Sequence, residues 1–334
     1  MSNVDNNYYT DINNYLLNDN YVFNFFIGGR GIGKTYSMLK KIYDEEIPFI
    51  YLRYTNTELD ISVNADLFHQ YGDKISFNRI EDGFYSFKTE DKMIGYGMSL
   101  TTFKSKRGID FSWIKLIFFD EFIPEVGARK VISYVGDVFQ NMYETVNRNR
   151  ELEGDKPVLF VGCANSNNIN NPLMIDLGLV KIAERLIRSE QEFYFDDDRR
   201  MQLAILKASP VFLEQKSKTA LYSFATEKFK DMSLNNIFAY NDFSNVKQKD
   251  LRGYQPIVAI ANRFTIYKQK GDEQYYCHPS IGAGVDVYDI NNVIEKQRLL
   301  NKYLIFFNAK FYKNKMTFST YEIKSLFIEL FVKL

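Results

Sequence analysis

A glycine-rich segment near the N-terminus has the composition of a phosphate-binding loop. It follows the pattern G-x-x-x-x-G-K-T and consists of Gly28, Gly29, Arg30, Gly31, Ile32, Gly33, Lys34 and Thr35. Glycines at these spacings let successive backbone N–H groups converge on phosphate oxygens, while the lysine reaches the β- and γ-phosphates and the threonine hydroxyl can bind Mg²⁺. The segment predicts a site for ATP and Mg²⁺. The sequence contains no guanine-selecting N-K-x-D pattern, which argues against GTP.

Two adjacent acids, Asp120 and Glu121, follow the apolar run Leu-Ile-Phe-Phe. A buried parallel strand would deliver Asp120 to the carboxyl edge of a sheet, where its carboxylate can hold Mg²⁺ together with Thr35. Glu121 is then expected to position and polarise the attacking water, the role of this acid in ATPases that hydrolyse their nucleotide. The alternative, a strand end with two solvated acids, is weakened by the phosphate loop upstream.

Three further side chains could contact the transferred phosphoryl group. Arg30 could bind a phosphate or the acid pair through its guanidinium, or it could be a solvated loop residue. Arg148 or Arg150 could stabilise the developing charge within the subunit or from a neighbour, although helices often end in basic residues for dipole reasons alone. Asn165 closes an apolar run and is predicted to sense the γ-phosphate, with a turn cap as the alternative.

A basic run is the candidate for DNA contact. Lys104, Lys106 and Arg107 fall within four residues and form the densest group of cations in the first half of the chain. Three cations on one loop suit a contact that follows a DNA backbone, and they are equally compatible with a solvated loop.

The elements that must position these residues alternate between strand-like and helical patterns. Apolar strands are predicted at 21–27, 49–53, 114–119 and 157–164, and helices at 35–46 and 129–147. The second helix carries Val131, Tyr134, Val138, Met142 and Val146 on one apolar face. This alternation predicts an α/β fold with a mostly parallel central sheet flanked by helices.

The composition narrows the class of protein. The 334 residues are 46% hydrophobic and 25% charged with a formal net charge of zero, which is typical of a globular protein without a general attraction to polyanions. Cys163 and Cys277 make no metal-ligand spacing with His69 or His278, so we expect neither a zinc site nor disulfides. We therefore expect the protein to work in a reducing compartment. No apolar run approaches the ~18 residues of a membrane span, so we expect neither secretion nor a membrane.

The pattern changes twice along the chain. A charged patch at 196–200 and a change of character from Met232 onward suggest an ATPase domain at 1–190, a linker subdomain with short helices at 191–230, and a smaller α/β domain at 231–334. The last domain is expected to contain a hairpin from 256–260 and 263–268, and a helix-rich end at 302–334.

The ordered set of motifs resembles the DNA-packaging ATPases of small tailed phages with protein-primed linear genomes, a terminase-like branch of the additional-strand P-loop motors. The resemblance runs along the whole chain, and its most specific parts are the R-N-R-E block and the overall length. It is carried by G-x-R-G-I-G-K-T-Y at 28–36, F-I-Y-L-R at 49–53, F-D-E-F-I at 119–123, T-V-N-R-N-R-E at 145–151, Asn165, and M-S-L at 232–234.

The resemblance implies the ATPase roles given above for Lys34, Thr35, Asp120 and Glu121. It favours Arg148 over Arg150 as the arginine finger offered to a neighbouring subunit. It also implies a homomeric ring, expected to have five subunits, on the portal of an empty capsid in the host bacterial cytoplasm, with double-stranded DNA driven through a pore that the 104–107 loop faces. A structural RNA is a partner in part of the family.

The family resemblance also implies that the last domain has an RNase H-like nuclease fold without the acidic residues needed for cleavage. Asp242, Asp286 and Asp289 are present, but their positions do not indicate a metal-binding cluster, so we expect no nuclease activity.

Two other functions remain open at this point. The chain could be a nucleotide-gated scaffold that docks on a capsid or membrane without significant turnover, which the Asp120–Glu121 pair argues against. It could also be a cellular helicase or plasmid-transfer translocase with the same chemistry, which residue spacing does not distinguish from a viral motor.

Overall fold

The computed structural model describes residues 9–16, 18, 20–106, 108–124, 135–166, 169–226, 230 and 244–332, without the side chains of Lys104 and Lys106. Arg107, Asp242, the predicted helical positions 129–134 and the motif at 232–234 lie outside the described residues. The chain divides into two compact units, Met1–Tyr240 and Asn241–Leu334.

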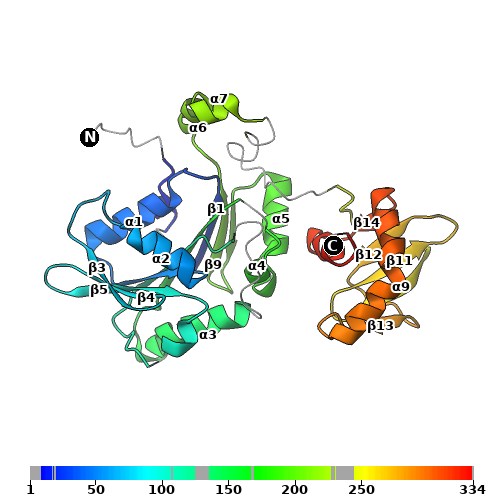
Figure 1. Ribbon diagram of the computed structural model, residues 1–334, viewed down its shortest axis with the longest axis horizontal. Coiled ribbons are helices and arrows are strands. Elements are labelled where there is room, and N and C mark those ends of the chain that lie inside the picture. The colour runs from blue at the N-terminus through cyan, green and yellow to red at the C-terminus, as the bar shows by residue number, and fades with distance from the viewer. Residues whose placement is uncertain are drawn as a thin grey trace. The chain divides into compact units, whose positions relative to one another are not determined.

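The first unit is built on a mixed sheet of nine described strands (Figure 1). In order across the sheet they are β3 (Ser76–Glu81), β4 (Phe84–Lys88), β5 (Met93–Ser99), β2 (Phe49–Arg53), β6 (Leu116–Asp120), β7 (Leu159–Asn165), β1 (Phe23–Gly28), β9 (Met201–Leu206) and β8 (Phe193–Asp196). The six strands from β5 to β9 in this order are parallel, and the outer strands β3, β4 and β8 pair antiparallel. The predicted α/β class with a mostly parallel sheet is confirmed.

Helical segments connect these strands and cover the sheet. They are η1 (Ile12–Tyr15), α1 (Lys34–Glu45), α2 (Asn56–Asn64), η2 (Phe103–Lys106), α3 (Val135–Asn147), η3 (Arg150–Glu153), α4 (Pro172–Asp176), α5 (Val180–Ser189), α6 (Pro210–Ser217) and α7 (Ala220–Phe224). Among the described residues, no helix combines the length and the apolar character needed to cross a bilayer.

Strand pleating divides the core of this unit between the two faces of the sheet. Phe26 packs with Met38 of α1 in one hydrophobic cluster. Its neighbour Phe25 faces the other way and packs on Phe160, which also contacts Phe139 of α3. Because helices lie on both faces, the central strands are buried on both sides and read in the sequence as continuous apolar runs.

The segment predicted as a linker subdomain differs from our expectation. Strands β8 and β9 lie within 191–230, yet β9 pairs with β1 in parallel and every residue of β9 is buried. The charged patch at 196–200 is the turn between these two strands and not the start of a new unit. The large sheet therefore continues to Leu206. The short helices predicted for the linker are α6 and α7, which come after the sheet in the chain.

The second unit contains a smaller sheet in the order β13 (Asp286–Tyr288), β10 (Tyr254–Ile260), β11 (Phe264–Gln269), β12 (Tyr275–His278) and β14 (Met316–Phe318). Strands β10 and β11 form the predicted hairpin, which is confirmed. Helices α9 (Val293–Tyr312) and α10 (Tyr321–Phe331) pack on this sheet through Phe307 and Phe327. The likeness to a nuclease fold stays a prediction.

Replacing Phe160 by alanine should destabilise the first unit by about 3–5 kcal/mol, since it removes a fully buried ring from between Phe25 and Phe139. Thermal unfolding of Phe160→Ala beside Phe195→Ala checks this. Phe195 is 50% exposed on the edge strand β8, and its loss should cost at most about 1 kcal/mol. Equal shifts in the two variants would contradict the burial argument.

Candidate functional site

The strand order brings four predicted or newly identified residues to one edge of the sheet. Strands β2, β6, β7 and β1 are neighbours and parallel, so their carboxyl ends lie side by side. These ends carry Arg53, Asp120, Asn165 and Gly28 respectively. The phosphate loop leaves β1 at this edge and leads directly into α1.

The backbone of the phosphate loop requires its glycines. Gly31 and Gly33 have φ values of 76° and 109°, in the left-handed region that disfavours side chains. A Cβ on Gly33 would also lie 2.9 Å from the Cβ of Tyr9. Helix α1 begins at Lys34, so its first unpaired N–H groups and the positive end of its dipole face the loop. The loop therefore has the geometry of an anion site.

Lys34 is buried, with 6% of its surface exposed. Its Nζ donates hydrogen bonds to the carbonyl oxygens of Gly29 at 2.7 Å and Gly28 at 3.0 Å, and it lies 3.4 Å from Oδ1 of Asn165. Burial lowers the pKa of Lys34 to about 8, against the opposing attraction of nearby acids. A buried ammonium held by neutral carbonyls is ready to pair with an anion.

Thr35 and Asp120 form the pair of oxygen ligands that Mg²⁺ prefers. Oγ1 of Thr35 donates to Oδ1 of Asp120 at 2.8 Å, and the hydroxyl of Tyr51 donates to Oδ2 at 3.1 Å. Burial raises the pKa of Asp120, and the Arg53 charge opposes that rise. A hydroxyl and one carboxylate are few protein ligands, as expected for Mg²⁺ that also binds substrate phosphates. The donor set fits the ion.

Arg53 is a site residue that the sequence analysis did not assign. Its Nη2 lies 2.6 Å from Oε2 of Glu121, and its Nη1 lies 3.3 Å from Oδ2 of Asp120. Arg53 is itself 8% exposed, so this pair of contacts is largely shielded from water. A capping box between Thr55 and Glu58 starts α2 immediately afterwards and fixes the exit of the chain. The available signal was a basic residue closing the apolar run F-I-Y-L-R.

Glu121 adopts a left-handed backbone conformation, with φ of 55°. Non-glycine residues in this region are uncommon, and functional sites are one of the places where they cluster. The turn aims the side chain back along the sheet edge, where Oε1 accepts a 3.4 Å contact from Nδ2 of Asn165. The side chain is 40% exposed, so the carboxylate has both a fixed position and access to water.

The two candidate arginines differ in how they are held. Nη2 of Arg150 donates to the carbonyl oxygens of Ser112 at 2.7 Å and Phe111 at 3.0 Å, which ties it to its own chain. Arg148 is exposed, and its Nη2 lies 3.5 Å from the carbonyl oxygen of Ile109. Arg148 also has a left-handed backbone, with φ of 50°. Its guanidinium is the freer of the two to contact another molecule.

Within one chain, Arg148 does not meet the phosphate loop. The loop at 109–112 that it contacts lies before the amino end of β6, whereas Asp120 lies at the carboxyl end. A strand of this length spans roughly 13 Å, so Arg148 lies at the opposite edge of the sheet. Within one chain, Arg148 therefore lies away from the phosphate loop and the acid pair.

The structure describes Arg30 fully and the basic run at 104–107 only in part. Arg30 lies at the exposed tip of the phosphate loop, and its carbonyl accepts a 2.5 Å hydrogen bond from Lys216 of α6. The backbone of Lys104 and Lys106 forms η2, while their side chains and all of Arg107 lie outside the described residues. The expectation of a DNA contact there stays a prediction.

In the described part of the second unit, the two predicted acids each have another partner. Asp286 pairs with Lys302 at 2.8 Å, and Asp289 accepts from the backbone of Asn291 at 2.9 Å. Across the described ranges, no group of three or more His, Cys, Asp or Glu side chains is placed to hold a metal ion. The absence of nuclease activity remains a prediction, because Asp242 is not described.

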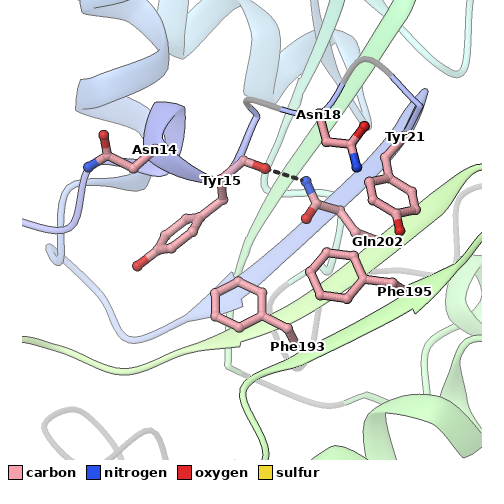
Figure 2. Close-up of a pocket in the computed structure, with 7 residues that line it drawn as sticks. All are labelled: Asn14, Tyr15, Asn18, Tyr21, Phe193, Phe195 and Gln202. Atoms are coloured by element: carbon pink, nitrogen blue, oxygen red, sulfur yellow. Dashed lines mark hydrogen bonds between the residues drawn. The ribbon is translucent and has the colours of Figure 1, made fainter.

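A groove with a volume of about 430 Å³ lies elsewhere on the first unit, along β8, β9 and the N-terminal segment. Figure 2 shows the rings of Phe193 and Phe195 beside one another and the amide of Gln202 pointing toward the carbonyl of Tyr15, to which it donates at 2.8 Å. The described residues that line this groove include none from the phosphate loop or the acid pair. It is a feature separate from the candidate site.

Comparison with known proteins shows that this chain is similar to phage DNA packaging proteins. The model of the podovirus DNA encapsidation protein (Gp16) family matches residues 4–333. The DNA packaging protein of Bacillus phage B103 is 26% identical over 239 residues, which cover 63% of this chain and 72% of that protein.

Two solved structures share the fold over nearly the whole chain. In the bacteriophage Phi-29 viral genome packaging motor assembly, the matching chain has a TM-score of 0.68 at 20% identity and covers 97% of this chain and 98% of its own length. In the Phi-28 gp11 DNA packaging motor, the TM-score is 0.60 at 18% identity, with 98% and 99% covered.

The buried ammonium of Lys34 should make stability depend on pH in a defined direction. Its pKa of about 8 is below the ordinary 10.5, so between these values the folded chain binds fewer protons than the unfolded chain and gains stability as pH rises. In nucleotide-free protein, Lys34→Met should lose this gain, which amounts to about 3 kcal/mol. Denaturant unfolding from pH 7 to 10 measures it.

Lys40→Met is the matched control for this experiment, because Lys40 is exposed on the same helix and pairs with Asp44. It should not remove the gain between pH 8 and 10. Parallel pH profiles for wild type and Lys34→Met would show that the ammonium of Lys34 is not desolvated in solution.

Proposed function

The chain belongs to the podovirus DNA encapsidation protein (Gp16) family, and we propose that it is the ATP-hydrolysing subunit of a ring-shaped motor that drives double-stranded viral DNA into a preformed capsid. The observation that carries the proposal is the meeting of Lys34, Asp120 and Glu121 at one sheet edge beside the phosphate loop. Related proteins bear the name DNA packaging protein, and chains of the same fold occur in packaging motor assemblies.

The residues of the phosphate loop bind and orient the triphosphate. The N–H groups of the loop and the first turn of α1 face the phosphates, and the Lys34 ammonium can exchange the carbonyls of Gly28 and Gly29 for phosphate oxygens. Thr35 and Asp120 would hold Mg²⁺, which supplies neutralisation of charge on the β- and γ-phosphates.

Glu121 is the proposed general base. Its carboxylate accepts a proton from the attacking water, and Arg53 and Asn165 fix its two oxygens in place. Arg53 acts as a positioning residue, because it touches the two acids and not the reacting atoms. Asn165 lies between Lys34 and Glu121, at 3.4 Å from each, and we propose that it senses the γ-phosphate.

Arg148 is the proposed finger for a neighbouring subunit's nucleotide, where it would stabilise the charge on the transferred phosphoryl group. The proposal is supported by its exposure, by its place at the opposite edge of the sheet, and by the ties that hold Arg150 to its own chain. It requires a closed homomeric ring, which we propose to be a pentamer mounted on the capsid portal in the host cytoplasm.

The pore-facing role of Lys104, Lys106 and Arg107 and a structural RNA partner remain proposals drawn from the sequence. The ordered site with its acid pair and the family membership give no support to a scaffold without turnover. A cellular translocase is likewise not favoured, because the matched relatives are phage packaging proteins.

Glu121→Gln should bind Mg-ATP within about twofold of wild type and hydrolyse it 10²–10⁴ times more slowly, since only the proton acceptor is lost. Calorimetric titration and a phosphate-release assay with double-stranded DNA test this. Glu90→Gln, at an exposed acid between β4 and β5, is the control and should keep full turnover. Normal DNA-stimulated turnover in Glu121→Gln would remove the catalytic assignment.

Complementation can locate the finger. Arg148→Ala and Glu121→Gln rings should each be inactive, whereas an equimolar mixture should recover roughly a quarter of wild-type turnover, because an intact Glu121 then meets a neighbour's intact Arg148 at about one interface in four. A mixture of Lys34→Ala with Glu121→Gln disables the same side of each interface and should recover nothing. No recovery in the first mixture would refute a finger supplied in trans.

A further inference from the structure

Helix α6 carries a cation directly onto the phosphate loop. Lys216 extends from the last turn of this helix, and its Nζ donates to the carbonyl of Arg30 at 2.5 Å. A Cβ built on Gly31 would lie 3.5 Å from the same nitrogen. The ammonium of Lys216 is therefore at the middle of the loop, although 186 positions separate it from Arg30 in the sequence.

Aromatic rings hold this lysine in place. Its Nζ lies 4.8 Å from the ring centroid of Phe212, one turn earlier on α6, and 5.4 Å from that of Tyr222 on α7. Phe212 is buried, and its ring also packs against Tyr9, 6.0 Å away, whose Cβ approaches Gly33 of the loop. The rings stabilise the charge through cation–π attraction and keep α6 in contact with the loop.

Two ammonium groups thus face one short loop. Lys34 approaches from within the loop and Lys216 from α6, and the Lys216 charge acts with burial to lower the pKa of Lys34. In both contacts the partners are neutral backbone carbonyls of the loop, at Gly28, Gly29 and Arg30. Among the described residues, no carboxylate forms a hydrogen bond with either ammonium, and a bound polyanion would relieve their mutual repulsion.

We propose that Lys216 is a second phosphate-binding lysine, which contacts the polyphosphate chain of the bound nucleotide from α6 and so ties the position of α6 and α7 to nucleotide occupancy. The inference deepens the proposed function and rests on it. The ammonium exchanges the Arg30 carbonyl for a phosphate oxygen, a stronger partner because the hydrogen bond is then charge-assisted at both ends.

The chain offers a matched control two positions away. Lys218 caps the same helix, but its Nζ pairs with Glu214 at 2.6 Å and its side chain is 69% exposed. Lys216→Met keeps an unbranched apolar stem over the rings of Phe212 and Tyr222 while removing the charge. Lys216→Arg keeps the charge.

The test is the affinity for Mg²⁺ with a non-hydrolysable ATP analogue, measured by calorimetry on the full chain. Lys216→Met should bind about tenfold more weakly than wild type, Lys216→Arg should recover most of that loss, and Lys218→Met should bind as wild type does. Hydrogen exchange should show that the analogue protects α6 and α7 in wild type and not in Lys216→Met.

Wild-type affinity in Lys216→Met, or an equal loss in Lys216→Met and Lys216→Arg, would overturn the inference, since charge would then not be the cause. Failure of wild type to bind the analogue would instead refute the proposed function itself. Thermal unfolding of each variant without nucleotide identifies a folding defect, and Lys216→Arg keeps the charge testable if Lys216→Met unfolds.

Discussion

Two adjacent carboxylates at the end of one buried strand need a cation beside them, and Arg53 supplies it. Without Arg53, the buried Asp120 and the neighbouring Glu121 would repel each other in a poorly solvated environment, where an uncompensated charge is costly. The contact is possible because β2 and β6 are parallel neighbours in register, so both strands end at the same level. The order of the sheet and the chemistry of the site thus depend on each other.

Two residues with proposed roles in hydrolysis, Glu121 and Arg148, have strained backbone conformations. Glu121 and Arg148 both adopt left-handed backbone conformations, one at each edge of the sheet. At Glu121 the turn sends the carboxylate along the edge instead of onward with the strand, and the ion pair with Arg53 holds it there. At Arg148 the turn follows the end of α3, and the exposed guanidinium lies near the carbonyl of Ile109.

Much of this arrangement could be predicted from the sequence, because its central strands are apolar on both faces and its loop has a fixed glycine pattern. Strands β1, β2, β6 and β7 and the start of α1 lie within about two residues of their predicted positions. Strand β9 was not predicted as part of the sheet, because the charged turn at 196–200 resembled a domain boundary. Its partner β1 is also far away in the sequence, so no local pattern records their pairing.

The sequence predicts mainly those site residues that belong to a local motif or close a predicted strand. Lys34, Thr35, Asp120 and Glu121 belong to local patterns, whereas Arg53 and Lys216 reach the site through tertiary contacts that one sequence does not record. No motif in the sequence includes Lys216, and its position beside the loop follows from the packing of α6.

The separation of Arg148 from its own phosphate loop has a consequence for timing. Under the proposed function, an isolated copy has the phosphate loop and Glu121 at one edge of its sheet, while its own Arg148 lies away from them. The proposal therefore implies that free chains leave ATP intact, and that consumption begins only once each copy has closed against the next.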